Sequence, residues 1–181
     1  AYWQDLAWQF DYFSRPHGAY LFGQYAATGW WYYFPVAFLL KTPLPTLLLL
    51  AYALIRLATA VIRQRSFRAV VHFDLGVLLL ATAVYALISL FTPLNIGYRH
   101  LLPILPFVYL LIAVSLSPRP PLPRSPAPLL LLWLLLVTLF TWPDYIAYFN
   151  RLAGPAETRW RALSDSNVDW GQDLPALAAW Q

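Results

Sequence analysis

The stretch Gly97-Tyr98-Arg99-His100-Leu101-Leu102-Pro103 places a cationic and a titratable side chain at the start of an apolar segment that runs to about Leu116. The apolar segment before it ends near Thr92. Helices that cross a bilayer need about 20 mainly apolar residues and collect their polar residues at the ends. We therefore predict that this stretch lies at the edge of a membrane.

The composition excludes a water-soluble fold. Of the 181 residues, 60% are hydrophobic and only 11% are charged, whereas soluble domains average about 25% charged residues. A chain of this length could not bury so much apolar surface. The absence of cysteine excludes disulfides, thiol catalysis and cysteine-ligated metals. The net charge is +4, and the arginines cluster at the ends of the apolar segments. This distribution fits membrane topology better than nucleic-acid binding.

Four apolar segments are predicted to cross the membrane, over residues 43–62, 72–91, 99–116 and 127–142. The first begins near Pro43, because a span centred on Lys41 would place an ammonium group near the midplane at about 2.5–3.5 kcal/mol or more. The aromatic stretch 30–40 then becomes an interfacial helix kinked at Pro35, with Lys41 at the interface. Pro103 and Pro106 are expected to bend the third span.

The predicted fold class is an all-α integral membrane protein. Residues 1–42 form an extracytoplasmic loop with short helical pieces and the interfacial helix, 43–143 the transmembrane region, and 144–181 a small extracytoplasmic segment. The positive-inside rule places the loops after the first and third spans in the cytoplasm, and both ends of the chain outside. The alternative is a re-entrant fourth segment, which would move the tail to the cytoplasm. The basic residues of these loops are Arg63, Arg65, Arg68, Arg119 and Arg124.

The ends of the chain suggest a piece of a longer protein. No methionine is present, no basic region precedes a short apolar stretch near Ala1, and Leu174–Gln181 resembles the beginning of a helix, with Asp173 as its cap. We therefore expect an N-terminal part of the same protein to precede this chain, and a tail that is truncated.

The tail carries two patterns of interest. Apolar residues at three- and four-residue spacing between Tyr145 and Leu152 predict a helix along the membrane surface. Asp165, Asn167 and Asp169 then alternate as in the first half of a calcium loop. The required glycine is Trp170 here and the twelfth position is Ala176, so the pattern fails, and turns and caps made by these side chains are the favoured interpretation. Trp170 beside Asp169 would also suit stacking on a sugar ring.

Arg99, His100 and Lys41 are the candidate ligand-binding residues. The planar fork of Arg99 suits phosphate oxygens, and a lipid supplies phosphates at a membrane edge. The alternative for Arg99 is a general topological anchor, and for Lys41 an interfacial side chain that extends to the headgroups. His17 is a further candidate as a base or phosphate donor, although a single loop histidine usually has neither role. No nucleotide-binding, metalloprotease or serine-nucleophile motif occurs.

Four stretches in this order resemble the C-terminal half of bacterial membrane glycosyltransferases similar to the protein mannosyltransferases of glycosyltransferase family 39. The resemblance covers most of the chain, from about residue 17 to the end. The stretches are residues 30–45 (WWYYFPVAFLLKTPLP), 97–103 (GYRHLLP), 148–150 (YFN) and 165–174 (DSNVDWGQDL).

The resemblance implies a multi-pass GT-C fold in the bacterial inner membrane. It implies transfer of a sugar from a polyprenyl-phosphate-linked donor to an extracytoplasmic acceptor, with a catalytic acid in a region that precedes this chain. No catalytic residue, metal ligand or cofactor is therefore assigned here. Lipid-phosphate contact is carried over to Arg99, with His100 and Lys41 as lesser candidates, and sugar or acceptor contact to Asp169, Trp170 and His17. The alternative function is a non-enzymatic lipid-binding or transporter-like membrane module. A transporter would be expected to have polar or broken helices at the midplane, whereas the second and fourth spans of this chain are nearly featureless, which favours a scaffold.

Overall fold

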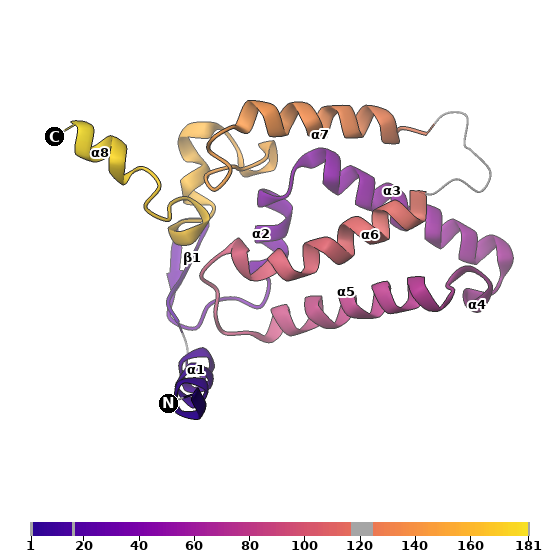
Figure 1. Ribbon diagram of the computed structural model, residues 1–181, viewed down its shortest axis with the longest axis horizontal. Coiled ribbons are helices and arrows are strands. Elements are labelled where there is room, and N and C mark those ends of the chain that lie inside the picture. Colours follow the sequence, from indigo (N-terminus) through magenta and orange to yellow (C-terminus); the bar gives the residue numbers. More distant parts are fainter. Residues whose placement is uncertain (1, 16, 117–124, 181) are drawn as a thin grey trace. The chain divides into compact units, whose positions relative to one another are not determined.

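The computed structural model describes residues 2–15, 17–116 and 125–180, and most of these are helical (Figure 1). Arg119 and Arg124, which the topology prediction uses, lie outside the described residues. The elements in chain order are α1 (Tyr2–Ser14), β1 (Ala19–Leu21), β2 (Gln24–Ala26), α2 (Tyr33–Lys41), α3 (Leu44–Gln64), α4 (Phe67–Val70), α5 (Phe73–Phe91), η1 (Tyr98–Ile104), α6 (Leu105–Leu116), α7 (Ala127–Thr141), η2 (Arg151–Ala153), η3 (Ala156–Arg161), η4 (Asp165–Asn167) and α8 (Leu174–Trp180), where η denotes a 3-10 helix.

The chain forms two compact units. The first combines Ala1–Lys41, Ser89–His100 and Asp144–Gln181, and the second combines Thr42–Ile88 and Leu101–Pro143. The first unit therefore gathers three segments that are distant in the sequence, and the second contains the long apolar helices.

Three helices are long and apolar enough to cross a membrane: Leu44–Gln64, Phe73–Phe91 and the continuous segment Tyr98–Leu116. Three of the four predicted spans are thus confirmed as helices of membrane-spanning length. Large apolar side chains such as Ile62 and Leu80 are exposed on them, as expected of surfaces that face lipid. In the second unit, α3 packs against both α6 and α7.

The fourth apolar helix, α7, is shorter than the other three. Its 15 residues extend over about 22 Å at 1.5 Å per residue, against a hydrocarbon core of about 30 Å. It begins after Pro126, with Pro128 in its first turn. It ends at Thr141 because Trp142, the residue before Pro143, takes an extended conformation (φ −59°, ψ 134°).

Prolines decide where two other helices begin. A helix does form in the aromatic stretch, but the kink predicted at Pro35 does not: α2 begins at Tyr33, so Pro35 lies in the first turn, where its missing N–H breaks no helical bond. In the third span, a 3-10 helix containing Pro103 precedes the regular helix that begins at Leu105. The first half of that span, where a bend is predicted, is therefore a 3-10 helix rather than a regular α-helix.

The N-terminal region and the tail differ from the predictions. The region expected to be a loop with short helical pieces contains the helix α1 and, in addition, an unpredicted hairpin in which β1 and β2 pair antiparallel, Ala19 opposite Ala26. The hairpin turn uses two positive φ angles, at Phe22 (49°) and Gly23 (81°), as two-residue hairpin turns require. The helix predicted between Tyr145 and Leu152 is absent from this described region, which forms turns and η2, whereas the helix predicted after Asp173 is confirmed as α8.

Candidate functional site

Asn167 is the centre of the first unit. Its side chain is buried, with 1% of the residue exposed. Its Nδ2 donates to the Tyr33 hydroxyl at 2.9 Å and to the Ser164 carbonyl at 3.0 Å, and its Oδ1 accepts from the Tyr98 amide at 2.8 Å. One amide therefore joins the tail, α2 and the beginning of the segment that contains Arg99.

Lys41 also connects α2 to the tail. Its ammonium donates to the carbonyls of Ile146 at 2.7 Å and Asn167 at 2.6 Å, and lies 4.3 Å from the centre of the Phe149 ring. The residue is buried, and burial lowers its pKa to about 8. The sequence predicts that this ammonium lies at the lipid interface. The structure instead uses two of its three donors inside the unit, at the C-terminal end of α2, where a cation is favourable.

The lowered pKa of Lys41 predicts a pH dependence of stability. Between pH 8 and 9.5 the unfolded side chain keeps its proton while the folded one loses it, so the unfolded state binds more protons and stability rises with pH. We expect the difference in melting temperature between the wild type and Lys41→Met to move in favour of the wild type over this range. Thermal unfolding at pH 7, 8 and 9.5 measures it, and a difference that does not change with pH would contradict the assignment.

Asn150 joins the tail to the C-terminal end of α2 by hydrogen bonds. Its backbone N–H donates to the Leu40 carbonyl at 2.9 Å and its Nδ2 to the Leu39 carbonyl at 2.6 Å. Its Oδ1 accepts from the Leu152 amide at 2.9 Å and so caps η2. The terminal carbonyls of a helix need partners from outside the helix, and here the tail supplies them. This docking explains why the predicted tail helix does not form across residue 150.

Gly97 and Ser166 bring the tail against the beginning of the Arg99 segment. The Ser166 hydroxyl donates to the Ile96 carbonyl. A Cβ atom at Gly97 would lie 2.2 Å from Ser166 Oγ and 3.4 Å from Ser166 Cβ, so glycine is required for this approach while the hydroxyl is present.

We expect Gly97→Ala to destabilise the protein by about 1–2 kcal/mol, because the added methyl displaces the Ser166 hydroxyl from its bond. The same change in a Ser166→Ala background should cost clearly less, since the nearest remaining atom is Cβ. Gly76→Ala is the control, because its nearest neighbour would lie at an ordinary 3.7 Å. Thermal unfolding of the wild type, the two single variants and the double variant measures the coupling, and equal costs in both backgrounds would show that the contact is not made.

Arg99 and Trp170 lie at the exposed edge of the contact between the tail and the Arg99 segment. The guanidinium carbon of Arg99 lies 5.6 Å from the centre of the Trp170 ring, and the indole N–H donates to the Ser166 carbonyl at 2.5 Å. Both residues are exposed. Among the described residues no carboxylate pairs with Arg99, so its fork of donors faces solvent and is held by an aromatic ring. The His100 ring is half-buried and meets the edge of the Phe34 ring at 6.2 Å.

The remaining predicted residues have local roles. Asp169 is exposed and accepts from the Gly171 amide at 2.6 Å, which stabilises a turn. His17 Nδ1 lies 2.8 Å from the Arg15 carbonyl, and its ring contacts Tyr12. No contact in the described structure brings His17 to Arg99 or Trp170. Among the residues described, no group of three or more acidic, histidine or cysteine side chains gathers to hold a metal.

Asn95 and Tyr33, which are not among the predicted site residues, also contribute to the interior of the first unit. Asn95 is buried, and its Oδ1 accepts from the Trp30 amide at 2.8 Å while its Nδ2 donates to the Thr92 carbonyl at 3.1 Å. Asn95 and Tyr33 also line a cavity of about 320 Å³ with Tyr20 and Tyr25. The sequence does contain a signal for Asn95, because an asparagine among apolar residues is often buried, and a buried amide needs hydrogen-bond partners.

Comparison of the chain with known protein families finds no match. Comparisons with curated proteins and with solved structures likewise find no match. The family resemblance is therefore carried by the four sequence stretches alone. The class of protein that the fold defines is a helical chain with three helices able to cross a membrane.

Proposed function

We propose that this chain is part of a membrane glycosyltransferase that moves a sugar from a polyprenyl-phosphate-linked donor to an extracytoplasmic acceptor. One observation supports this most strongly. Residues from each of the four stretches that carry the resemblance are joined by direct hydrogen bonds within the first unit, and the bond that spans the most sequence joins Tyr33 and Asn167, 134 residues apart. Stretches that are needed only for membrane insertion would have no reason to converge.

Arg99 is the proposed contact for the phosphate of the donor. A guanidinium offers paired donors to phosphate oxygens, and such bonds strengthen as negative charge develops on the leaving phosphate. The exposed Trp170 ring beside it offers a face for the sugar or for the guanidinium itself. Lys41 and His100 then act by holding the stretches that present Arg99, since both are at least half-buried. We assign no catalytic acid and no metal to these residues; the acid is proposed to lie elsewhere in the full-length protein.

The proposal includes an orientation in the bacterial inner membrane, with both ends of the chain outside. The cysteine-free sequence makes single-cysteine labelling direct. We expect a membrane-impermeant maleimide to label Gln172→Cys in intact cells, and Ser66→Cys and Ser125→Cys only after permeabilisation. Labelling of Ser66→Cys in intact cells would reverse the orientation. Protection of Gln172→Cys together with Ser66→Cys and Ser125→Cys would show that α7 does not cross.

The experiment that tests the function is a transfer assay on the full-length protein. Purified protein in lipid is given polyprenyl-phosphate-linked sugars and an extracytoplasmic protein or lipid acceptor, and product is followed by mass spectrometry. Transfer that requires the phosphate-linked donor supports the proposal. Binding of such lipids without any transfer would instead favour a lipid-binding module.

A further inference from the structure

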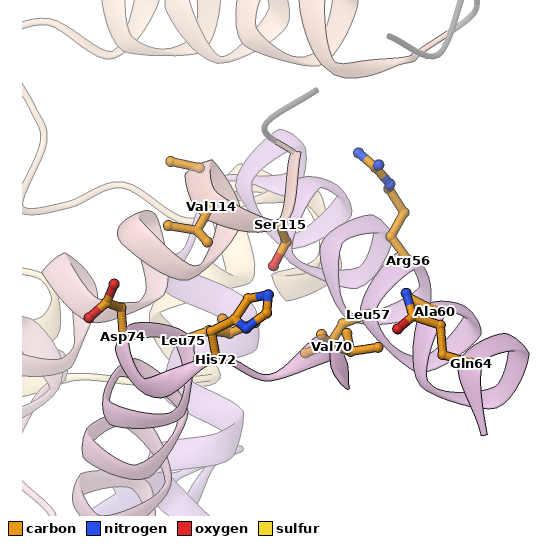
Figure 2. Close-up of a pocket in the computed structure, with 11 residues that line it drawn as sticks. Arg56, Leu57, Ala60, Gln64, Val70, His72, Asp74, Leu75, Val114 and Ser115 are labelled. Atoms are coloured by element: carbon orange, nitrogen blue, oxygen red, sulfur yellow. The ribbon is translucent and has the colours of Figure 1, made fainter. Parts of the chain in front are cut away.

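A second polar site lies in the membrane-spanning unit, where α3 ends, α5 begins and α6 ends. A pocket of about 650 Å³ opens there (Figure 2). Its polar side chains come from all three regions, while the rest of its lining is apolar. The polar lining residues are Arg56, Gln64, His72, Asp74 and Ser115.

The charged groups of the pocket are not used by the protein itself. In the described part of the chain, no side-chain hydrogen bond or ion pair occupies Arg56 or Asp74. The Ser115 hydroxyl is buried and has no hydrogen-bond partner. Arg56 lies about two turns before the end of α3, inside a helix of membrane-spanning length. Polar and charged groups within such helices are costly and usually serve a ligand or a pathway.

The arrangement of charge indicates the kind of ligand. Figure 2 shows Asp74 on one side of the labelled group and Arg56 on the other, with His72 between them and the Ser115 hydroxyl directed toward the His72 ring. Arg56 gives the lining a positive side chain and Asp74 gives it a negative one. A purely anionic ligand would leave Asp74 opposed, whereas a zwitterion satisfies both ends.

From this we infer that the pocket binds the headgroup of a phospholipid that carries a primary amine, with its phosphate on Arg56 and His72 and its ammonium on Asp74. The apolar part of the lining, which includes Leu57 and Val114, suits the glycerol and the beginnings of the acyl chains. None of the residues that line this pocket belongs to the proposed donor site, so the two sites share no residue. It does not depend on sugar transfer, and a protein that fails to transfer would still bind this lipid.

The test is lipid retention by the purified full-length protein in micelles containing equal amounts of phosphatidylethanolamine and phosphatidylglycerol, read by native mass spectrometry. We expect the wild type to retain phosphatidylethanolamine about five-fold over phosphatidylglycerol, a difference of about 1 kcal/mol. Asp74→Asn should lose this preference yet keep total phospholipid, and Arg56→Gln should retain about five-fold less of both lipids. Arg63→Gln, at an exposed position of the same helix outside the pocket, should behave as the wild type.

A second experiment uses only the wild-type protein, so its result does not depend on whether a variant folds. The quaternary ammonium of phosphatidylcholine cannot donate to a carboxylate, so the wild type should retain phosphatidylethanolamine over phosphatidylcholine as well. Equal retention of the lipids by the wild type, or an unchanged preference in Asp74→Asn, would overturn the inference.

Discussion

Asn167→Ala is expected to lower the free energy of unfolding by about 3 kcal/mol, because it removes three hydrogen bonds that a buried side chain makes. The amide makes three hydrogen bonds from a fully buried position, to the Tyr33 hydroxyl, the Ser164 carbonyl and the Tyr98 amide. Tyr33 is buried and the other two partners are half-buried, so water replaces the lost bonds only in part. The first unit should therefore loosen, and the orientation of the Arg99 segment with it.

Gln172→Ala is the matched control. That amide also makes two backbone bonds, with the Val168 carbonyl and the Trp170 amide, but from an exposed position where water replaces them. We expect a loss of less than about 1 kcal/mol. Asn167→Asp separates the two halves of the amide, since it keeps the acceptor for Tyr98 and loses both donors. Thermal unfolding in detergent measures all three variants, and equal losses for Asn167→Ala and Gln172→Ala would contradict the central position of Asn167.

Arg99→Ala is expected to lower kcat/KM for sugar transfer by about 100-fold, the usual cost of removing a charged donor from a developing phosphate charge. Arg99→Lys should recover part of this, to within about 10-fold of the wild type, because lysine keeps the charge and loses the paired geometry. The effect should appear with donors of different sugars, since the contact is to the phosphate that they share.

Arg161→Ala provides a closely matched control. Arg161 also lies over a tryptophan in the first unit, 5.2 Å from the centre of the Trp160 ring. Trp160 and Trp170 are equally exposed, at 51% and 52%. A general effect of removing an exposed arginine near an aromatic ring would appear in both variants. Wild-type transfer by Arg99→Ala, or an equal loss in Arg161→Ala, would remove Arg99 from the proposed site.

The membrane helices could be predicted from the sequence because their signal is local. Length and apolar composition identify a span without reference to the rest of the chain, and the predicted segments 72–91 and 99–116 differ from Phe73–Phe91 and Tyr98–Leu116 by one residue at the first end. Prolines are equally local, which is why the irregular first half of the third span was predictable. The kink predicted at Pro35 is absent because α2 begins at Tyr33, three residues after the aromatic stretch begins, which places Pro35 in the first turn.

The interior of the first unit could not be predicted because its partners are distant. Lys41 appears interfacial from its neighbours, yet its two carbonyl partners follow it by 105 and 126 residues. The spacing between Tyr145 and Leu152 predicted a helix, but the bonds of Asn150 to α2 hold the chain in turns instead. In each case a tertiary hydrogen bond overrode a local pattern.

The most direct test of the central claim, that Arg99 and Trp170 contact the phosphate end of a polyprenyl donor, is photo-crosslinking. The full-length protein carries p-benzoylphenylalanine at position 170, or at the equally exposed position 160, and is irradiated with labelled polyprenyl phosphate. We predict labelling from position 170 that unlabelled polyprenyl phosphate competes and polyprenol does not, with little labelling from position 160. Equal labelling from both positions, or equal competition by polyprenol, would contradict a phosphate site at Arg99 and Trp170.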